Sequence, residues 1–139
     1  MDMLDAKVKK RLVQAARDSL NNAYAPYSNY KVGAALLTVT GKTICGANVE
    51  NAVYPLTVCA ERAAVFSAVS EGERDFIAIA VVTKDGGSPC GSCRQVLAEF
   101  GLDIIVIVAD TEGKTHYEKT VEQLLPESFG PSNLIEKTN

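Results

Sequence analysis

Three cysteines and one glutamate have a spacing that could place them around a single metal ion. Cys59 and Glu61 belong to a Cys-Ala-Glu-Arg run, and Cys90 and Cys93 form a later Cys-x-x-Cys pair. A catalytic zinc ion usually has three protein ligands and one open position for water. A carboxylate beside such a site can take a proton from that water and deliver it elsewhere. The pattern therefore predicts a catalytic zinc site with Glu61 as its acid–base group.

Two other interpretations of the cysteines stay open at this point. A Cys-x-x-Cys pair alone could be a redox pair or half of a structural zinc site. A structural site would need a fourth ligand, and Cys45 is available, but it lies in a predicted strand where a small buried thiol is expected. The one histidine, His116, is far from these motifs and is expected to be an exposed side chain.

Composition limits the class of protein. The chain has 139 residues, a one-domain length, so residues 1–139 are expected to form a single domain. With 14 Lys and Arg against 17 Asp and Glu, the net charge is −3, which argues against binding of nucleic-acid backbones. No apolar run approaches the roughly 20 residues that span a bilayer. A cytoplasmic location with reduced cysteines is therefore expected.

The elements that must position these residues alternate between helix and strand. Apolar residues at helical spacing, with Gly or Pro breaks, predict helices over 5–23, 59–72 and 90–100 and a helical turn over 121–125. Apolar and β-branched runs, with a polar run at the end, predict strands over 31–40, 43–49, 76–83, 104–109 and 114–120. This order predicts an α/β fold, a three-layer α/β/α sandwich with a mixed sheet of about five strands. Cys59 and Cys90 both begin predicted helices, where the helix dipole favours thiolates.

With these motifs in place, the sequence resembles the small cytidine deaminases of the all-cysteine zinc type. Cys-Ala-Glu followed by Pro-Cys-x-x-Cys matches the zinc deaminase signature. The resemblance extends over nearly the whole chain, through the segments 24–35, 48–54, 68–72, 94–97 and 124–129. Tyr30 stands where Phe is more usual, and a cysteine expected next to Asn48 occurs earlier, as Cys45.

The resemblance implies a function and a set of roles. A zinc-activated water would attack C4 of cytidine or 2′-deoxycytidine while Glu61 moves protons, releasing ammonia in a pyrimidine salvage reaction. One zinc ion per chain would be held by Cys59, Cys90 and Cys93. Arg62 would donate hydrogen bonds to the thiolates. Asn48 and Glu50 would hold the sugar, and Tyr54 lies in the same substrate segment. The Ala60 backbone N–H would meet the base O2, and Tyr30 and Phe129 would flank the ring. Phe129 would come from a neighbouring subunit of a homotetramer with shared active sites.

Three competing functions remain. A deaminase of bases within RNA or DNA would need a basic channel, which an acidic chain of this length does not favour. A deaminase of a cytosine-containing antibiotic would share the cysteine motif but not the Asn-Val-Glu-Asn segment at 48–51. A binding module stapled by zinc would make Glu61 dispensable.

Overall fold

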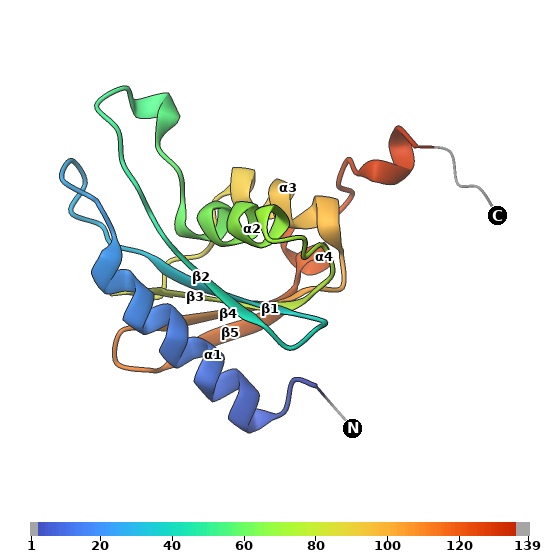
Figure 1. Ribbon diagram of the computed structural model, residues 1–139, viewed down its shortest axis with the longest axis horizontal. Helices are drawn as coiled ribbons and strands as arrows, with labels where there is room; N and C mark the ends of the chain where they lie inside the picture. The colour runs from blue at the N-terminus through green and yellow to red at the C-terminus, as the bar shows by residue number, and fades with distance from the viewer. Residues whose placement is uncertain (1–2, 136–139) are drawn as a thin grey trace.

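A five-stranded sheet in the order β2-β1-β3-β4-β5 forms the centre of the protein. The computed structural model describes residues 3–135 (Figure 1). The strands are β1 (Gly33–Thr38), β2 (Thr43–Ala47), β3 (Phe76–Thr83), β4 (Ile105–Asp110) and β5 (Thr115–Thr120). Only β3 and β4 pair in parallel, and the other three pairs are antiparallel. The sheet is therefore mixed, as predicted.

Helices cover both faces of this sheet. The helix α1 (Ala6–Ser19) packs on one face against β1, β3 and β2, whereas α2 (Ala60–Ser70) packs on the other. Figure 1 shows α3 (Gly91–Phe100) and the short α4 (Val121–Leu124) on the same side as α2. This arrangement confirms the predicted three-layer α/β/α fold.

The central strands separate two apolar cores because successive side chains of a strand point to opposite faces. In β3, Ile79 and Val81 belong to the core beneath α2 and α3. Ala78, Ala80 and Val82 belong to the core beneath α1. Burial on both faces explains why this strand is a continuous apolar run in the sequence.

Close backbone packing fixes where α2 begins. A Cβ atom on Gly46 of β2 would lie 2.5 Å from both the Ala60 carbonyl oxygen and the Ala64 nitrogen. Only a glycine lets the first turn of α2 lie this close to the sheet. The helix is slightly shorter than the predicted 59–72, because Cys59 is its N-cap and Gly72 adopts a positive φ of 92° after its end.

Two segments project from the layers. One contains the turn Tyr54–Leu56 between β2 and α2, and the other contains Pro131–Asn133 after α4 (Figure 1). Within the described residues, no helix is long and apolar enough to cross a membrane. The cytoplasmic location stays a prediction.

Candidate active site

The beginnings of α2 and α3 bring three sulfur atoms together. Cys59 is the N-cap of α2, Cys90 is the N-cap of α3, and Cys93 is buried in the first turn of α3. The Sγ atoms of Cys59 and Cys90 are 3.9 Å apart, and those of Cys90 and Cys93 are 3.5 Å apart. Tetrahedral Zn–S bonds of about 2.3 Å separate sulfurs by about 3.8 Å. The cluster therefore has the size that a zinc ion requires.

Cys45 lies apart from this cluster. Among residues 3–135, one group of three side chains has ligand atoms close enough to share a metal ion. It consists of Cys59, Cys90 and Cys93. The Cys45 sulfur instead faces the Ala15 carbonyl oxygen of α1, 4.0 Å away. The expectation that Cys45 is buried is wrong, because β2 is an edge strand and its thiol is exposed.

Electrostatics around the sulfurs favour a bound cation. Hydrogen bonds from Cys93 and Arg62 lower the pKa of the Cys59 thiol to about 5. The interaction with Cys59, together with burial, raises the pKa of Cys93. Without a cation, one thiol of the pair ionises at the expense of the other, whereas a metal would stabilise the thiolates together. Thiolates and zinc are matched in softness, so the donor set fits this ion.

Arg62 lies against the cluster. Its Nη2 donates to the Cys59 sulfur at 3.3 Å, and Cys59 raises the pKa of the guanidinium. Its Nε is buried and has no hydrogen-bond partner among the described residues. A buried cation with an unused donor is costly, and a negatively charged metal–thiolate group beside it would offset that cost.

Glu61 is a buried carboxyl group next to the sulfurs. Its side chain is 4% exposed in the first turn of α2. Burial, and then the negative charge of Cys59, raises the pKa of Glu61 to about 7. A group with this pKa can both accept and release a proton near neutral pH.

A cavity of about 300 Å³ opens beside the cluster. Six predicted site residues line it: Tyr30, Asn48, Glu50, Cys59, Glu61 and Cys90. Polar residues that the sequence did not single out also line it: Ser28, Thr57, Thr83 and Ser88. A larger hollow of about 600 Å³ lies between α1 and β5, but it has no cysteine or buried carboxylate among its lining residues.

Glu50 and Asn48 are held in place by the chain that precedes β1. The Glu50 carboxylate accepts hydrogen bonds from the backbone N–H groups of Tyr27 and Ser28, at 2.9 and 3.1 Å, and from the Ser28 hydroxyl. The buried Asn48 amide accepts from the Val32 N–H at 2.9 Å and donates to the Tyr30 carbonyl at 2.8 Å. Asn48 therefore organises the wall of the cavity, while Glu50 is a preorganised carboxylate within it.

Two predicted substrate contacts, Tyr54 and Phe129, lie away from this cavity, whereas Ala60 stands between Cys59 and Glu61 at the start of α2. Tyr54 is 71% exposed and its ring contacts Tyr27, whereas Phe129 is 57% exposed; neither lines the cavity. The Ala60 side chain is fully buried, and its backbone N–H is one of those that begin α2 without an intrahelical partner. Ser28 was within the motif at 24–35, so its role in holding Glu50 had a signal in the sequence.

The fold and the cluster together describe an α/β protein with three cysteines that could hold a metal ion beside a buried carboxyl group. The family model described as "Cytidine and deoxycytidylate deaminase zinc-binding region" matches residues 6–109. A cytidine deaminase of Halalkalibacterium halodurans is 50% identical over 124 residues, covering 87% of this chain and 93% of that protein. One of Sporosarcina psychrophila is 44% identical over 128 residues, covering 90% and 93%.

Structural similarity agrees with these matches. The crystal structure of cytidine deaminase from Burkholderia pseudomallei superimposes with a TM-score of 0.83 at 45% identity, covering 91% of this chain and 100% of that one. The chain belongs to the cytidine and deoxycytidylate deaminase family.

Proposed function

We propose that this protein hydrolyses the amino group of cytidine and 2′-deoxycytidine, giving ammonia and uridine or 2′-deoxyuridine, in pyrimidine salvage. The observation that carries the proposal is a buried carboxyl group, Glu61, beside three clustered sulfurs, with Glu61, Cys59 and Cys90 lining one cavity. The similarity to proteins named cytidine deaminase supports the choice of substrate.

Cys59, Cys90 and Cys93 would hold one zinc ion per chain. When bound, zinc would lower the pKa of a coordinated water and so supply the nucleophile. The N-cap positions of Cys59 and Cys90 favour thiolates, because helix N-termini carry partial positive charge. Arg62 would donate to the Cys59 sulfur and offset part of the excess negative charge.

Glu61 would move the protons. Its pKa of about 7 suits a group that first takes a proton from water and then gives one away. It would protonate N3 of the cytosine ring, which makes C4 a better electrophile. It would then carry a proton to the departing amino nitrogen, because ammonia leaves more readily than its anion.

Glu50 and Asn48 would select a nucleoside. Both line the same cavity as Glu61, and Glu50 is held by Tyr27 and Ser28 before any ligand binds. A fixed carboxylate and amide suit sugar hydroxyl groups, and a site built for hydroxyls rejects ligands that lack them. Tyr30 would flank the base, and the Ala60 N–H would meet the base O2.

Ammonia release with a substrate panel tests this function. Cytidine and 2′-deoxycytidine should react, free cytosine should react very poorly, and CMP, a cytosine-containing antibiotic and single-stranded DNA serve as the competing arms. Equal kcat/KM for cytosine and cytidine would show that the sugar is not recognised. Glu61→Gln should retain fold and zinc and lose about 10²–10⁴ in turnover. Near-native turnover in this variant would favour a binding module instead.

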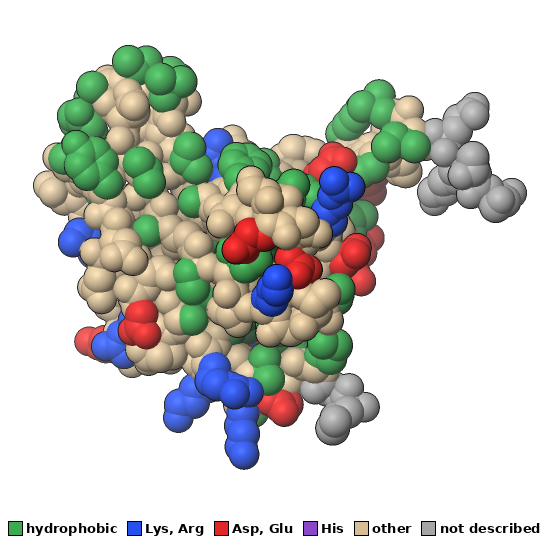
Figure 2. All heavy atoms as spheres, viewed as in Figure 1, with side chains coloured by type: hydrophobic (Ala, Val, Ile, Leu, Met, Phe, Trp, Pro, Cys, Tyr) green, Lys and Arg blue, Asp and Glu red, His purple; other side chains and the backbone are tan. Residues whose placement is uncertain are grey.

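The assembly would be a homotetramer with shared active sites. Large apolar side chains are exposed on the two projecting segments, including Val53, Tyr54 and Leu56 on one and Phe129 and Leu134 on the other. Figure 2 shows hydrophobic surface gathered over both projections. Contiguous exposed apolar surface is typical of protein interfaces. Contact with neighbouring copies would bury it and bring Phe129 and Tyr54 to cavities of the assembly.

A further inference from the structure

The loop between β3 and α3, residues 84–89, connects the sheet directly to Cys90. Gly87 and Ser88 of this loop line the cavity together with Cys90. Any movement of the loop would therefore displace both a wall of the cavity and one of the clustered sulfurs. At its end nearest Cys90, Arg94 donates to the Pro89 carbonyl oxygen at 2.8 Å and to the Ser88 hydroxyl at 3.0 Å, and the Tyr117 hydroxyl also bonds to Ser88. Tyr30 and His116, from separate parts of the chain, contact the other half of the loop, at Gly86 and Gly87.

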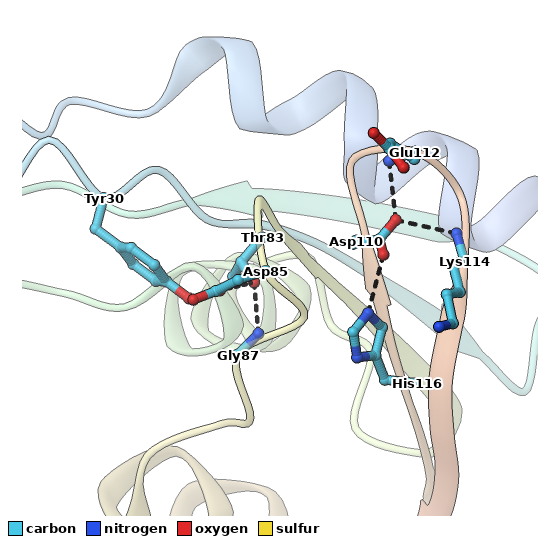
Figure 3. A network of polar contacts seen from close by, with 8 residues as sticks. All are labelled: Tyr30, Thr83, Asp85, Gly87, Asp110, Glu112, Lys114 and His116. Carbon is cyan, nitrogen blue, oxygen red and sulfur yellow. Dashed lines mark hydrogen bonds and ion pairs between the residues drawn. The ribbon is translucent and has the colours of Figure 1, made fainter.

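Tyr30 holds the loop from the cavity side. Its hydroxyl donates to Oδ1 of Asp85 at 2.6 Å, and the Thr83 hydroxyl donates to the same oxygen at 3.2 Å (Figure 3). Thr83 Oγ1 in turn accepts from the Gly87 N–H at 2.6 Å. Partial burial and the bond to Asp85 raise the pKa of Tyr30, so that its hydroxyl remains a donor.

The position of the phenol explains why residue 87 is a glycine. A Cβ atom on Gly87 would lie 2.3 Å from the Tyr30 hydroxyl oxygen, whereas the next ring atom is 3.5 Å away. The φ angle of Gly87 is not in the left-handed region, so the backbone itself would accept alanine. The hydroxyl alone excludes a side chain there.

His116 of β5 holds the loop from another direction. A Cβ atom on Gly86 would lie 2.6 Å from the imidazole ring, and Gly86 has a positive φ of 73°. The His116 Nε2 is 2.9 Å from Oδ2 of Asp110, whose other oxygen accepts from the N–H groups of Glu112 and Lys114. Figure 3 shows this second network beside the first. The ring is thus anchored to the β4–β5 turn.

We propose that Tyr30 and His116 are positioning residues that clamp the loop 84–89 at Gly86 and Gly87, and so fix Cys90 and the cavity wall. This role for the Tyr30 hydroxyl is separate from any contact of its ring with a base. It concerns how firmly the loop is held, and its catalytic consequence rests on the proposed function.

The first test uses phenylalanine variants, which keep an aromatic ring at each position and remove the hydrogen bond from Tyr30 to Asp85 or that between His116 and Asp110. Tyr30→Phe and His116→Phe should speed amide hydrogen exchange of the peptide 84–90 by about threefold to tenfold, as expected for one lost hydrogen bond. Zinc release from the loaded protein to a chromophoric chelator should accelerate in the same variants. Tyr24→Phe, which alters an exposed tyrosine outside the cavity, is the matched control and should change neither rate. Exchange and release rates equal to those of the unaltered protein would overturn the clamp.

A second test identifies the contact between Tyr30 and Gly87. Gly87→Ala should accelerate zinc release and raise the KM for cytidine more than it lowers kcat, because the added methyl group meets the hydroxyl. Combined with Tyr30→Phe, the same Gly87→Ala change should have little further effect, since the clashing oxygen is gone. Equal effects of Gly87→Ala in both backgrounds would overturn the contact.

The readouts separate this proposal from the proposed function. If cytidine is not a substrate but exchange and zinc release change as expected, the clamp stands and the function fails. If cytidine reacts but the Tyr30 variants leave loop exchange and zinc release unchanged, the function stands and the clamp fails.

Discussion

At the scale of single residues, the clustered and the isolated cysteines lead to opposite expectations. Cys90→Ser should abolish stoichiometric zinc binding, because a hydroxyl is a poor ligand for zinc and two sulfurs would remain. Cys45→Ser should retain zinc, because its sulfur faces α1, away from the cluster. Metal analysis of both purified variants checks the assignment. A full zinc content in Cys90→Ser would remove this residue from the ligand set.

The Ser28 hydroxyl should make stability depend on pH through Glu50. The hydrogen bond from Ser28, chiefly, holds the pKa of the Glu50 carboxyl below its usual value of 4.5. A carboxyl group whose pKa is lowered on folding stabilises the folded state at pH values above the pKa of the unfolded chain. This contribution is lost as the pH falls through the pKa of the folded state. The stability difference between the unaltered protein and Ser28→Ala should therefore be largest above pH 4.5 and shrink below it.

Urea unfolding at several pH values measures this effect. The Ser28 hydroxyl also accepts a hydrogen bond from the Tyr30 N–H at 3.0 Å. Loss of this bond in Ser28→Ala lowers the free energy of unfolding by an amount that does not vary with pH. Glu50→Gln is the control background, because glutamine cannot titrate. If the pH dependence of the Ser28→Ala effect persists in this background, Glu50 is not its source.

At the scale of elements, the fit of α2 against β2 should be intolerant of a single methyl group. Gly46→Ala would place a carbon 2.5 Å from backbone atoms of Ala60 and Ala64, which cannot move without shifting the start of the helix. Overpacking of this kind costs about 1–3 kcal/mol. Activity should fall too, since Cys59 and Glu61 lie at that helix start. Gly130→Ala, where the added carbon meets nothing within 4 Å, is the control for thermal unfolding.

The sequence predicted these elements better than their arrangement. The apolar run at 76–83 indicated a strand buried on both faces, and β3 has these bounds. The two cysteine motifs indicated helix starts, and Cys59 and Cys90 are the N-caps of α2 and α3. Local patterns could not show that β1 lies between β2 and β3, because strand order depends on long-range packing. Nor could they show that Tyr54 lies outside the cavity of its own chain.

At the scale of the whole molecule, the proposed homotetramer would bury the exposed apolar projections between four copies. Light scattering should give four times the 14.8 kDa chain mass. Mixing Glu61→Gln chains with Phe129→Ala chains, after dissociation and reassembly, should restore activity, because some cavities would receive both residues intact from different copies. A fully active monomer would contradict the assembly. A tetramer without restored activity would remove Phe129 from the neighbouring cavity.

The two N-cap cysteines also have a consequence for the lifetime of the protein. Cys59 begins the helix that precedes β3 in the chain and Cys90 begins the helix that follows it, so a cation shared by them would act as a cross-link between two chain connections. A ligand that binds only the folded state stabilises that state by mass action. Metal supply would then govern how often these helices open to proteolysis, and zinc starvation would reduce the amount of the enzyme as well as its turnover.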